Sequence, residues 1–403
     1  MSEILFLAHR IPFPPDRGDK IRSFSIVKRL SELARVHVAA FADDAADAGH
    51  EGEMRKALGS GVASSYIEVR RRAKAVSLAA GLAGGRSASM AAFSSAGMRR
   101  HVSTLLDRTD IGGIFAFSGQ MGQYVTGKPG KIRFVMDFVD VDSAKFESYA
   151  ADARAPLRWL YRREAAQLAK EEARIARRSD LSLFVSEAEA ALFRARTGLG
   201  PERVQALENG VDLAYFDPAA TFASLTRADD APLIVFTGQM DYAPNIQAVT
   251  DFAHDVLPSI RASAPQTRFA IVGRNAGPAV AALGGLSGVE VVGAVPDTRP
   301  WLAAANVVVA PLRIARGIQN KVLEAMAMGR PVVASNAAFE GIDAVPGLEL
   351  TVADGADATA SAVLALLRDR SLAERMGRAA RARMCHHYAW DRQLAALGGL
   401  MLA

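Results

Sequence analysis

A cationic and an acidic side chain lie three residues apart in the C-terminal half, at Lys321 and Glu324. In a helix this spacing puts both groups on one face. An ammonium group for phosphate beside a carboxylate for ribose hydroxyls is suited to a nucleotide sugar. Arg313 and Arg316 add positive charge where the helix is expected to begin, and a helix start offers free N–H donors and a favourable dipole to an anion. The spacing also fits an ordinary strand–helix–strand unit with an ion pair on its helix.

Two short apolar runs flank these residues, at 307–311 and 332–334. Both are continuous and rich in valine, which is typical of buried parallel strands. The helix between them is expected to span 319–328 and to end at Gly329, because glycine readily adopts the left-handed conformation that follows a helix. The pattern therefore predicts a strand, a ligand-facing loop, a helix and a second strand.

Residues 324–335, EAMAMGRPVVAS, resemble the end of the donor-binding motif of retaining GT-B glycosyltransferases of the family 4 type, E-A-M-A-x-G-x-P-V-V-A-S. The longer string from Pro311, P-L-R-x-A-x-G-I-Q-N-K-V-L-E-A-M-A-M-G, resembles a bacterial subgroup, the sugar transferases associated with exosortase/PEP-CTERM exopolysaccharide systems. The family usually has a second glutamate eight positions before Glu324, where this chain has Arg316. The resemblance extends over nearly the whole chain.

This resemblance implies an α/β fold of two Rossmann-like domains that face each other across a cleft. The N-terminal acceptor-side domain is expected at 1–207, with a C-terminal helix at 388–403 crossing back to it, and the donor-binding domain at 208–387. The implied reaction is metal-independent and retaining, of the hexosyltransferase type. It moves a sugar from a nucleoside-diphosphate sugar to a hydroxyl acceptor, expected to be lipid-linked or a growing exopolysaccharide. No cofactor besides the donor substrate and no metal is expected.

The resemblance places the donor around the loop and helix described first. Glu324 would hold the ribose, while Arg316 and Lys321 would neutralise the departing diphosphate and count as catalytic. Many family members carry a phosphate-binding arginine and lysine just after the position of Gly238, and this chain has neither at 238–251. The expected donor-binding residues are Gly18, Gly238, Arg274, Arg316, Gly317, Ile318, Gln319, Asn320, Lys321 and Glu324.

Three carboxylates, Asp137, Asp140 and Asp142, follow an expected strand in the first half. Open α/β sheets bind ligands at the carboxyl ends of their strands. Family members often have a histidine near this strand end, and here an aspartate is expected in its place. Asp137 and Asp140 are the catalytic candidates, and the choice among the three stays open. Asp140-Val-Asp142 also spells the metal-binding D-x-D of another glycosyltransferase fold, and Asp142 or Ser143 alternatively caps the next helix.

A proline-rich loop that ends at Gly18 separates the first expected strand from the first expected helix. It lacks the G-x-G-x-x-G pattern, so the dinucleotide fingerprint is absent. Loops at this place bind ligands in doubly wound sheets. Arg17, Gly18, Asp19 and Arg22 are therefore candidates for contact with the sugar phosphate, and a proline-rigidified surface turn is the alternative.

Composition bounds the location and the partners. A single cysteine excludes a disulfide framework, no apolar run reaches the ~18 residues of a membrane span, and the start lacks a basic signal-peptide region, so a cytoplasmic protein is expected.

Basic residues outnumber acidic ones 32 to 24 in 1–207, and acidic residues outnumber basic ones 19 to 16 in 208–403. Nucleic acid is not expected, because no matching fold signature accompanies the charge. The basic stretch 70–74, with the apolar residues to 85, predicts peripheral contact with the inner face of the inner membrane or, alternatively, a solvated loop.

Two other classes of function fit the same residues. A sugar-nucleotide epimerase of this fold would act on the donor alone. A non-catalytic GT-B-like scaffold is favoured by Arg316 in place of the family's first glutamate. The sugar, the base, the acceptor and the oligomeric state stay open.

Overall fold

The computed structural model describes residues 3–70, 81, 85–107, 110–126, 132–225, 230–315 and 317–402. The chain forms two compact units, Met1–Glu208 with Leu394–Ala403, and Asn209–Gln393. The first boundary lies one residue after the predicted one. The returning segment begins later than the predicted residue 388, because Tyr388 is fully buried in the core of the second unit, where its hydroxyl accepts from the Asp343 backbone N–H.

The first unit is built on a seven-stranded sheet with the order β3-β2-β1-β4-β5-β6-β7, and every neighbouring pair is parallel. Its strands are β1 (Glu3–Ala8), β2 (Val36–Ala42), β3 (Val62–Val69), β4 (Ile111–Phe117), β5 (Arg133–Val139), β6 (Leu181–Phe184) and β7 (Val204–Ala206). The strand order reverses beside β1, so the loops after β1 and β4 diverge at the switch point where such sheets bind ligands.

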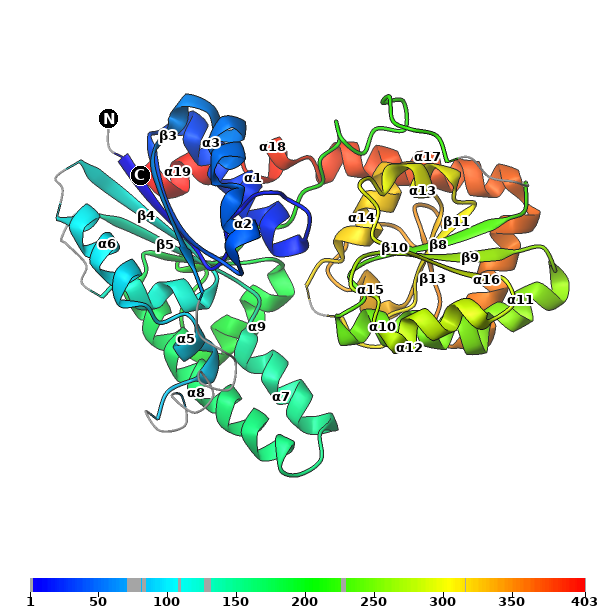
Figure 1. Cartoon of the computed structure of the whole chain (residues 1–403), viewed down its shortest axis with the longest axis horizontal. Helices are drawn as coiled ribbons and strands as arrows, with labels where there is room; N and C mark the ends of the chain where they lie inside the picture. The colour runs from blue at the N-terminus through cyan, green and yellow to red at the C-terminus, as the bar shows by residue number, and fades with distance from the viewer. Residues whose placement is uncertain are drawn as a thin grey trace. The chain divides into compact units, whose positions relative to one another are not determined.

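Helices cover this sheet and connect its parallel strands. They are α1 (Gly18–Leu33), α2 (Ala45–Gly49), α3 (Glu51–Leu58), α5 (Ala88–Ala92), α6 (Ala96–Leu106), α7 (Asp142–Asp152), α8 (Leu157–Arg178), α9 (Glu187–Thr197) and the C-terminal α19 (Leu397–Leu402). α19 lies beside α1, β4 and β5 (Figure 1). Gly113 of β4 makes room for it, since an added Cβ would lie 2.9 Å from Met401 Cε. Arg133 Nε donates to the Leu400 carbonyl at 3.2 Å.

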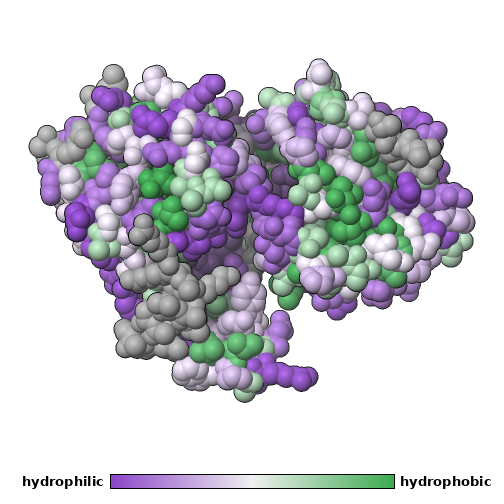
Figure 2. All heavy atoms as spheres, viewed as in Figure 1, coloured by the Kyte–Doolittle hydropathy of each residue, from purple (hydrophilic) through white to green (hydrophobic). Residues whose placement is uncertain are grey.

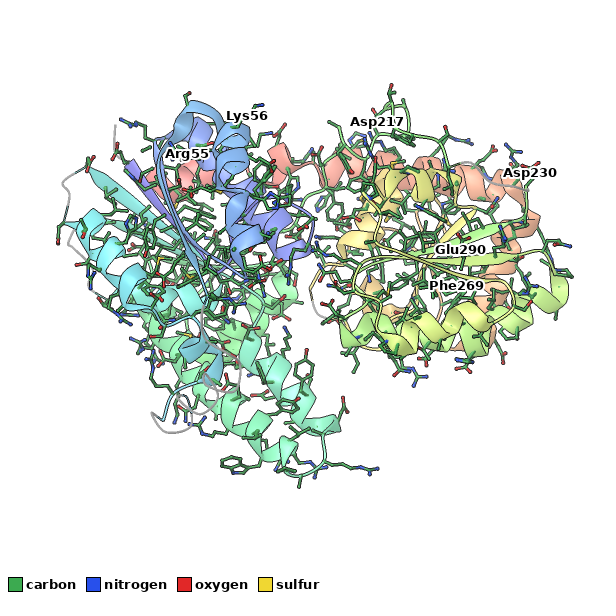
Figure 3. The ribbon with its side chains drawn as sticks, in the orientation of Figure 1. Arg55, Lys56, Asp217, Asp230, Phe269 and Glu290 are labelled. Carbon is green, nitrogen blue, oxygen red and sulfur yellow. The ribbon has the colours of Figure 1, made fainter. Side chains whose placement is uncertain are left out.

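The second unit contains a six-stranded parallel sheet with the order β10-β9-β8-β11-β12-β13. Its strands are β8 (Leu233–Thr237), β9 (Arg268–Val272), β10 (Val289–Gly293), β11 (Val307–Ala310), β12 (Val332–Ala334) and β13 (Thr351–Val352). Phe269 of β9 is fully buried and lies inside the unit (Figure 3). The predicted strands at 307–311 and 332–334 are thus confirmed as β11 and β12.

The helices of the second unit are α10 (Ala243–Asp251), α11 (Leu257–Ser263), α12 (Pro278–Ala282), α13 (Arg299–Ala304), α14 (Asn320–Ala327), α15 (Asn336–Phe339), α16 (Ala356–Arg368), α17 (Arg370–His387) and α18 (Trp390–Gln393). α13 and α17 lie on one side of the sheet, and α10 and α12 on the other (Figure 1). α14 is the predicted helix, and Gly329 follows it with a φ of 63°, as its sequence position predicts.

Each unit is therefore a Rossmann-like layer of parallel strands between helices, which is the predicted α/β class. No helix in the described part of the chain combines the length and the apolar composition needed to cross a bilayer.

Candidate functional site

Lys321 lies in the first turn of α14, at the carboxyl end of β8. Its Nζ donates to Asn245 Oδ1 at 2.5 Å and lies 4.3 Å from the centroid of the Phe236 ring. Asn245 is itself oriented, because its Nδ2 donates to the Gln239 carbonyl at 2.8 Å. Contacts from β8, the following loop and α10 therefore hold the ammonium group at this edge of the sheet.

Gly238 follows β8 directly and lies against the same ammonium group. An added Cβ there would lie 3.1 Å from Lys321 Nζ and 2.8 Å from Asn245 Nδ2. Gly273, directly after β9, is tighter still, since its Cβ would fall 1.6 Å from the Gly238 carbonyl oxygen. Glycine is required at both strand ends, and neither carries a side chain that would keep a ligand from the backbone.

Glu324 lies one turn beyond Lys321 on the same helix. Burial raises the pKa of Glu324 to about 7, and Lys321 opposes this rise. Burial also lowers the pKa of Lys321 to about 7, with Glu324 opposing. Among the contacts of the described residues, no ion pair joins the two. Both groups are therefore poised near neutral pH, and a bound phosphate would favour the charged ammonium.

Four of the predicted donor-binding residues, 317–320, lie in the loop before α14 and at the first position of that helix. Gly317 has a φ of 63°, and its carbonyl accepts from Gln319 Nε2 at 3.2 Å. Asn320 Oδ1 accepts from Asn209 Nδ2 at 3.2 Å. Ile318 is 7 % exposed and belongs to the hydrophobic core of the unit, so its side chain does not face a ligand. The prediction that Ile318 binds the donor is therefore corrected: its side chain is excluded, and only its backbone remains a candidate.

Three arginines near this loop differ in their positions. Arg313 Nε pairs with Asp251 Oδ2 at 2.5 Å, so part of the expected positive charge is neutralised by an acid of α10. Arg274 follows β9, and its carbonyl accepts from Met240 N–H at 2.9 Å, which joins the loops after β8 and β9. The predicted site residue Arg316 lies outside the described residues.

Asp137, at the end of β5, is turned into the interior of the first unit. The carboxylate is 0 % exposed and pairs with Arg22, which is 1 % exposed. Arg22 Nε lies 2.9 Å from Oδ2 and Nη2 lies 3.3 Å from Oδ1, while Val139 N–H donates to Oδ1 at 3.1 Å. A carboxylate without exposed surface does not reach a sugar. The direct catalytic contact predicted for Asp137, and the phosphate contact predicted for Arg22, are therefore corrected to a buried pair that joins β5 to α1.

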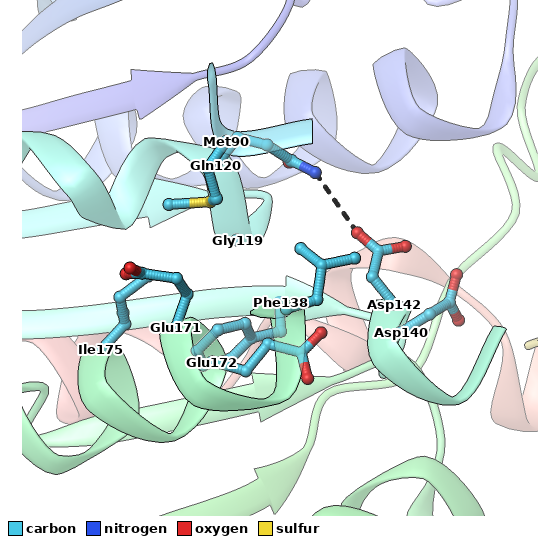
Figure 4. A pocket seen from close by; sticks show the side chains of 10 residues that line it. Met90, Gly119, Gln120, Phe138, Asp140, Asp142, Glu171, Glu172 and Ile175 are labelled. Carbon is cyan, nitrogen blue, oxygen red and sulfur yellow. Dashed lines mark hydrogen bonds between the residues drawn. The ribbon is translucent and has the colours of Figure 1, made fainter. Parts of the chain in front are cut away.

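Asp140 lies between β5 and α7 and behaves differently. Burial, together with the carboxylates of Glu189 and Asp142, raises the pKa of Asp140 to about 7. Its Oδ1 is buried and has no hydrogen-bond partner among the described residues. A small pocket lies here (Figure 4), in which Gln120 Nε2 donates to Asp142 Oδ2 at 3.3 Å. The lining residues are Met90, Gly119, Gln120, Phe138, Asp140, Asp142, Leu168, Glu171, Glu172 and Ile175.

The start of α7 is capped by acids from other helices. Glu189 of α9 accepts from Val141 N–H at 2.7 Å, and Glu172 of α8 accepts from Ser143 N–H at 3.0 Å. The alternative in which Asp142 or Ser143 caps this helix is therefore wrong, because partners distant in sequence satisfy the first N–H groups. Throughout the described ranges, no group of three or more histidine, cysteine, aspartate or glutamate side chains has an arrangement able to hold a metal ion.

Asp140 predicts a pH effect on stability. A folded pKa of about 7, above the ordinary 3.8, contributes stability that is fully present below pH 4 and lost as the pH rises through 7. The wild type should therefore lose stability between pH 5 and pH 8, and Asp140→Asn should not. The difference in unfolding free energy, variant minus wild type, should be at least about 1 kcal/mol larger at pH 8 than at pH 5. Urea unfolding at both pH values measures this gain. Asp152→Asn, at an exposed carboxylate of α7, is the control, and an equal gain in both variants would contradict the assignment.

A charged network directly after β1 contains the predicted candidates Arg17 and Asp19, and sequence reasoning missed its other members, His9, Arg10 and Asp43. His9 Nε2 lies 3.2 Å from Asp19 Oδ2, and Arg10 Nη1 lies 2.6 Å from the same oxygen. Arg17 Nε lies 2.8 Å from Asp19 Oδ1, and Arg10 Nε lies 3.0 Å from Asp43 Oδ2. Burial lowers the pKa of His9, so this ring is neutral near pH 7. The available signal was the position of His9 immediately after β1, the strand beside which the strand order reverses.

The other first-unit candidate, Gly18, is the first residue of α1, and Arg17 is its N-cap residue. The structure thus brings Gly18, Arg17 and Asp19 to the switch-point edge of the first sheet, and their contact with a ligand stays a prediction. Lys321, Glu324 and Gly238 gather at the corresponding edge of the second sheet. These are two separate groups of residues, one in each unit.

Two parallel-sheet units, with a C-terminal segment that returns to the first, define the GT-B architecture. The family described as "Glycosyl transferases group 1" matches residues 231–369, which include the α14 face. HepE from Anabaena, solved with UDP and glucose, matches with a TM-score of 0.70 at 15 % identity and covers 100 % of both chains. Sucrose-phosphate synthase from Thermosynechococcus elongatus matches with a TM-score of 0.71 at 17 % identity, over 99 % of this chain and 98 % of that one.

A curated relative matches in sequence as well. The chain is 29 % identical over 225 residues to a phosphatidyl-myo-inositol mannosyltransferase from Propionibacterium freudenreichii subsp. shermanii. The match covers 54 % of this chain and 55 % of the relative, so the chain spans about half the length of the curated relative it matches. The fold is that of GT-B glycosyltransferases, and the second unit carries the similarity to the group 1 family.

Proposed function

We propose that the protein is a retaining glycosyltransferase, which moves a sugar from a nucleoside-diphosphate sugar to a hydroxyl acceptor. The carrying observation is the face of α14, where Lys321 and Glu324 lie one turn apart beside the glycine loop at Gly238. The group 1 family match over residues 231–369 supports this function. The structure of HepE with UDP and glucose supports the class of donor.

In this proposal different residues of the second unit bind different parts of the donor. Glu324 accepts hydrogen bonds from the ribose hydroxyls. Lys321, the N–H groups of 317–320 and Arg316 neutralise the diphosphate as it departs, which contributes about 3–4 kcal/mol per preorganised interaction. Arg274 and Gly18 remain donor-binding candidates. Asp140 remains the catalytic candidate of the first unit, with Asp142 as the alternative for contact with the sugar.

The finer assignments belong to the same proposal. The transfer is metal-independent and of the hexosyltransferase type, and no cofactor besides the donor is used. The acceptor is lipid-linked or a growing exopolysaccharide of an exosortase/PEP-CTERM system, and the protein works in the cytoplasm, in peripheral contact with the inner face of the inner membrane. The relative named as a phosphatidyl-myo-inositol mannosyltransferase supports a hexosyl donor and a lipid-linked acceptor.

A donor screen tests the proposal. A bound donor raises the melting temperature by mass action, equivalent to about 2.7 kcal/mol at a hundredfold excess over the dissociation constant. The positive donors are then incubated with and without acceptor. Transfer or hydrolysis supports a glycosyltransferase, formation of an isomer indicates an epimerase, and binding without reaction indicates a scaffold. Failure of every nucleotide sugar to bind contradicts the proposal.

The pKa values of about 7 predict how donor affinity depends on pH. Below pH 7 Glu324 gains a proton and accepts fewer hydrogen bonds, while above pH 7 Lys321 loses the charge that attracts phosphate. Affinity should therefore peak near neutral pH. Calorimetric titrations across this range check the profile. Glu324→Gln should remove the acidic limb and Lys321→Arg the alkaline limb, and a flat wild-type profile would count against both roles.

A further inference from the structure

We propose that the end of the α7–α8 hairpin is a surface that docks on an anionic lipid bilayer. The two helices are joined by residues 153–156, and α8 begins with apolar side chains that face solvent. Trp159 is 62 % exposed and Leu157 is 51 % exposed. Trp159 is the most exposed large hydrophobic side chain in the described part of the chain.

The hairpin is a preformed platform for these two side chains. An aromatic cluster joins the helices, with ring centroids 6.0 Å apart for Phe146 and Tyr161 and 5.9 Å apart for Tyr149 and Tyr161. The hairpin extends away from the sheet of the first unit (Figure 1), and Figure 2 shows hydrophobic and hydrophilic side chains together at its end. Rings packed inside the hairpin stiffen it, while Trp159 stays on its outside. Insertion of the indole therefore needs little reordering.

Positive charge surrounds the exposed indole. Arg154, Arg158 and Arg162 are exposed, and none of them forms an ion pair with a described residue. Arg158 Nε donates to the Ala153 carbonyl at 2.8 Å, which orients that guanidinium at the turn. Trp159 and Arg162 are three residues apart, so they share a face of α8. Indole and guanidinium together match the interface of an anionic bilayer, where the ring sits at headgroup level and the cations meet phosphate.

A second observation links this surface to lipid contact. The sequence predicts membrane contact for the basic stretch 70–74 and the residues to 85, of which 71–80 and 82–84 lie outside the described residues. Gly81, within this segment, is fastened to α8, since Arg163 Nη2 donates to its carbonyl at 2.9 Å. Glu164 of α8 accepts from Ala88 N–H at 2.8 Å, just after the segment. Gly81 and Ala88 are therefore both bonded to α8, the helix that carries Trp159.

The size of the patch favours a bilayer over a protein. Two apolar side chains, among arginines that form no ion pair with a described residue, fall far short of the roughly 800 Å² per partner that a stable protein interface buries. A bilayer needs no matching surface, and each arginine near an anionic membrane strengthens binding about fivefold. The inference rests on the proposed function in one respect only: a lipid-linked acceptor would require the enzyme to bind at a membrane.

Vesicle co-sedimentation of the full chain tests the surface without any donor, so its outcome is independent of sugar transfer. The probes are vesicles of phosphatidylcholine alone and of equal parts phosphatidylcholine and phosphatidylglycerol. One variant combines Trp159→Ala with Leu157→Ser, and another combines Arg154→Glu with Arg162→Glu. The matched control combines Leu348→Ser with Arg370→Glu, whose side chains are exposed on the second unit. Melting curves check that every variant folds.

The wild type is expected to bind the anionic vesicles, to bind neutral ones at least tenfold more weakly, and to be released by salt. Charge reversal at two arginines should weaken binding at least about 25-fold. The apolar variant should weaken it several-fold, and the control should bind like the wild type. Tryptophan emission should shift to shorter wavelength on binding, and Trp159→Phe should abolish the shift.

Three results overturn the inference. The first is a wild type that stays unbound with both kinds of vesicle, which would leave the hairpin to a protein partner. The second is equal binding to neutral and anionic vesicles. The third is retention of binding in the two hairpin variants.

Discussion

Replacing Lys321 with alanine is expected to lower turnover at least about tenfold with every active donor. The ammonium group is preorganised at the strand edge by Asn245 and Phe236, so it attracts the leaving diphosphate without moving. Loss of one such interaction accounts for about 3–4 kcal/mol, and the N–H groups that start α14 would retain part of the effect. Steady-state measurement of kcat and KM checks the expectation.

Stability separates this effect from misfolding. Burial lowers the pKa of Lys321 to about 7, so the charged form is disfavoured in the folded protein. Melting curves of Lys321→Ala at pH 7 show whether the variant stays folded under the conditions of the kinetic measurement. Lys321→Arg keeps a cation and should recover part of the activity. Arg378→Ala, at an exposed arginine of α17, controls for loss of positive charge. Near-normal turnover in Lys321→Ala would reject the phosphate-binding role.

Asp137→Ala is expected to lower the unfolding free energy by about 3–5 kcal/mol, the cost of leaving a buried charge without its partner. The guanidinium of Arg22 is 1 % exposed, so water does not replace the lost carboxylate. Urea unfolding, followed by circular dichroism, measures the change.

A double variant isolates the origin of that cost. Arg22→Met with Asp137→Leu removes both charges at similar volume and should be more stable than Asp137→Ala alone. The exposed pair Arg196–Glu147 provides the comparison, because Glu147→Ala should cost less than about 1 kcal/mol. A stable Asp137→Ala protein without transfer activity would instead return Asp137 to the catalytic machinery.

The second sheet was predictable from the sequence because each strand can be recognised from its own residues. Strand β11 is a continuous run of valines between helices, and a parallel strand covered on both faces needs only apolar side chains. Helix α14 was equally clear, since Gly329 marks its end. The return of the chain to the first unit was predicted six residues early, because nothing near Tyr388 reveals that its ring belongs to the second core.

The first-unit site was harder to predict, because tertiary partners decide which acid faces outward. The sequence around a carboxylate that follows a strand does not show whether an arginine from another element pairs with it. Arg22 lies 115 residues from Asp137 and turns it inward. Glu172 and Glu189 likewise reach α7 from other helices and replace the expected local cap. His9 was overlooked because a histidine was sought only beside β5.

The packing of α19 has a consequence for how the protein is made. Leu397 and Met401 are buried against a sheet whose seven strands are all synthesised before residue 207. During synthesis most of the first unit emerges from the ribosome first, but its last segment emerges only at the end of the chain. The inserted second unit is complete before that last segment is made. A fragment ending at Glu208 would expose the apolar surface that α19 covers and be prone to aggregate. Separate expression of the first unit therefore calls for the final ten residues to be grafted onto it.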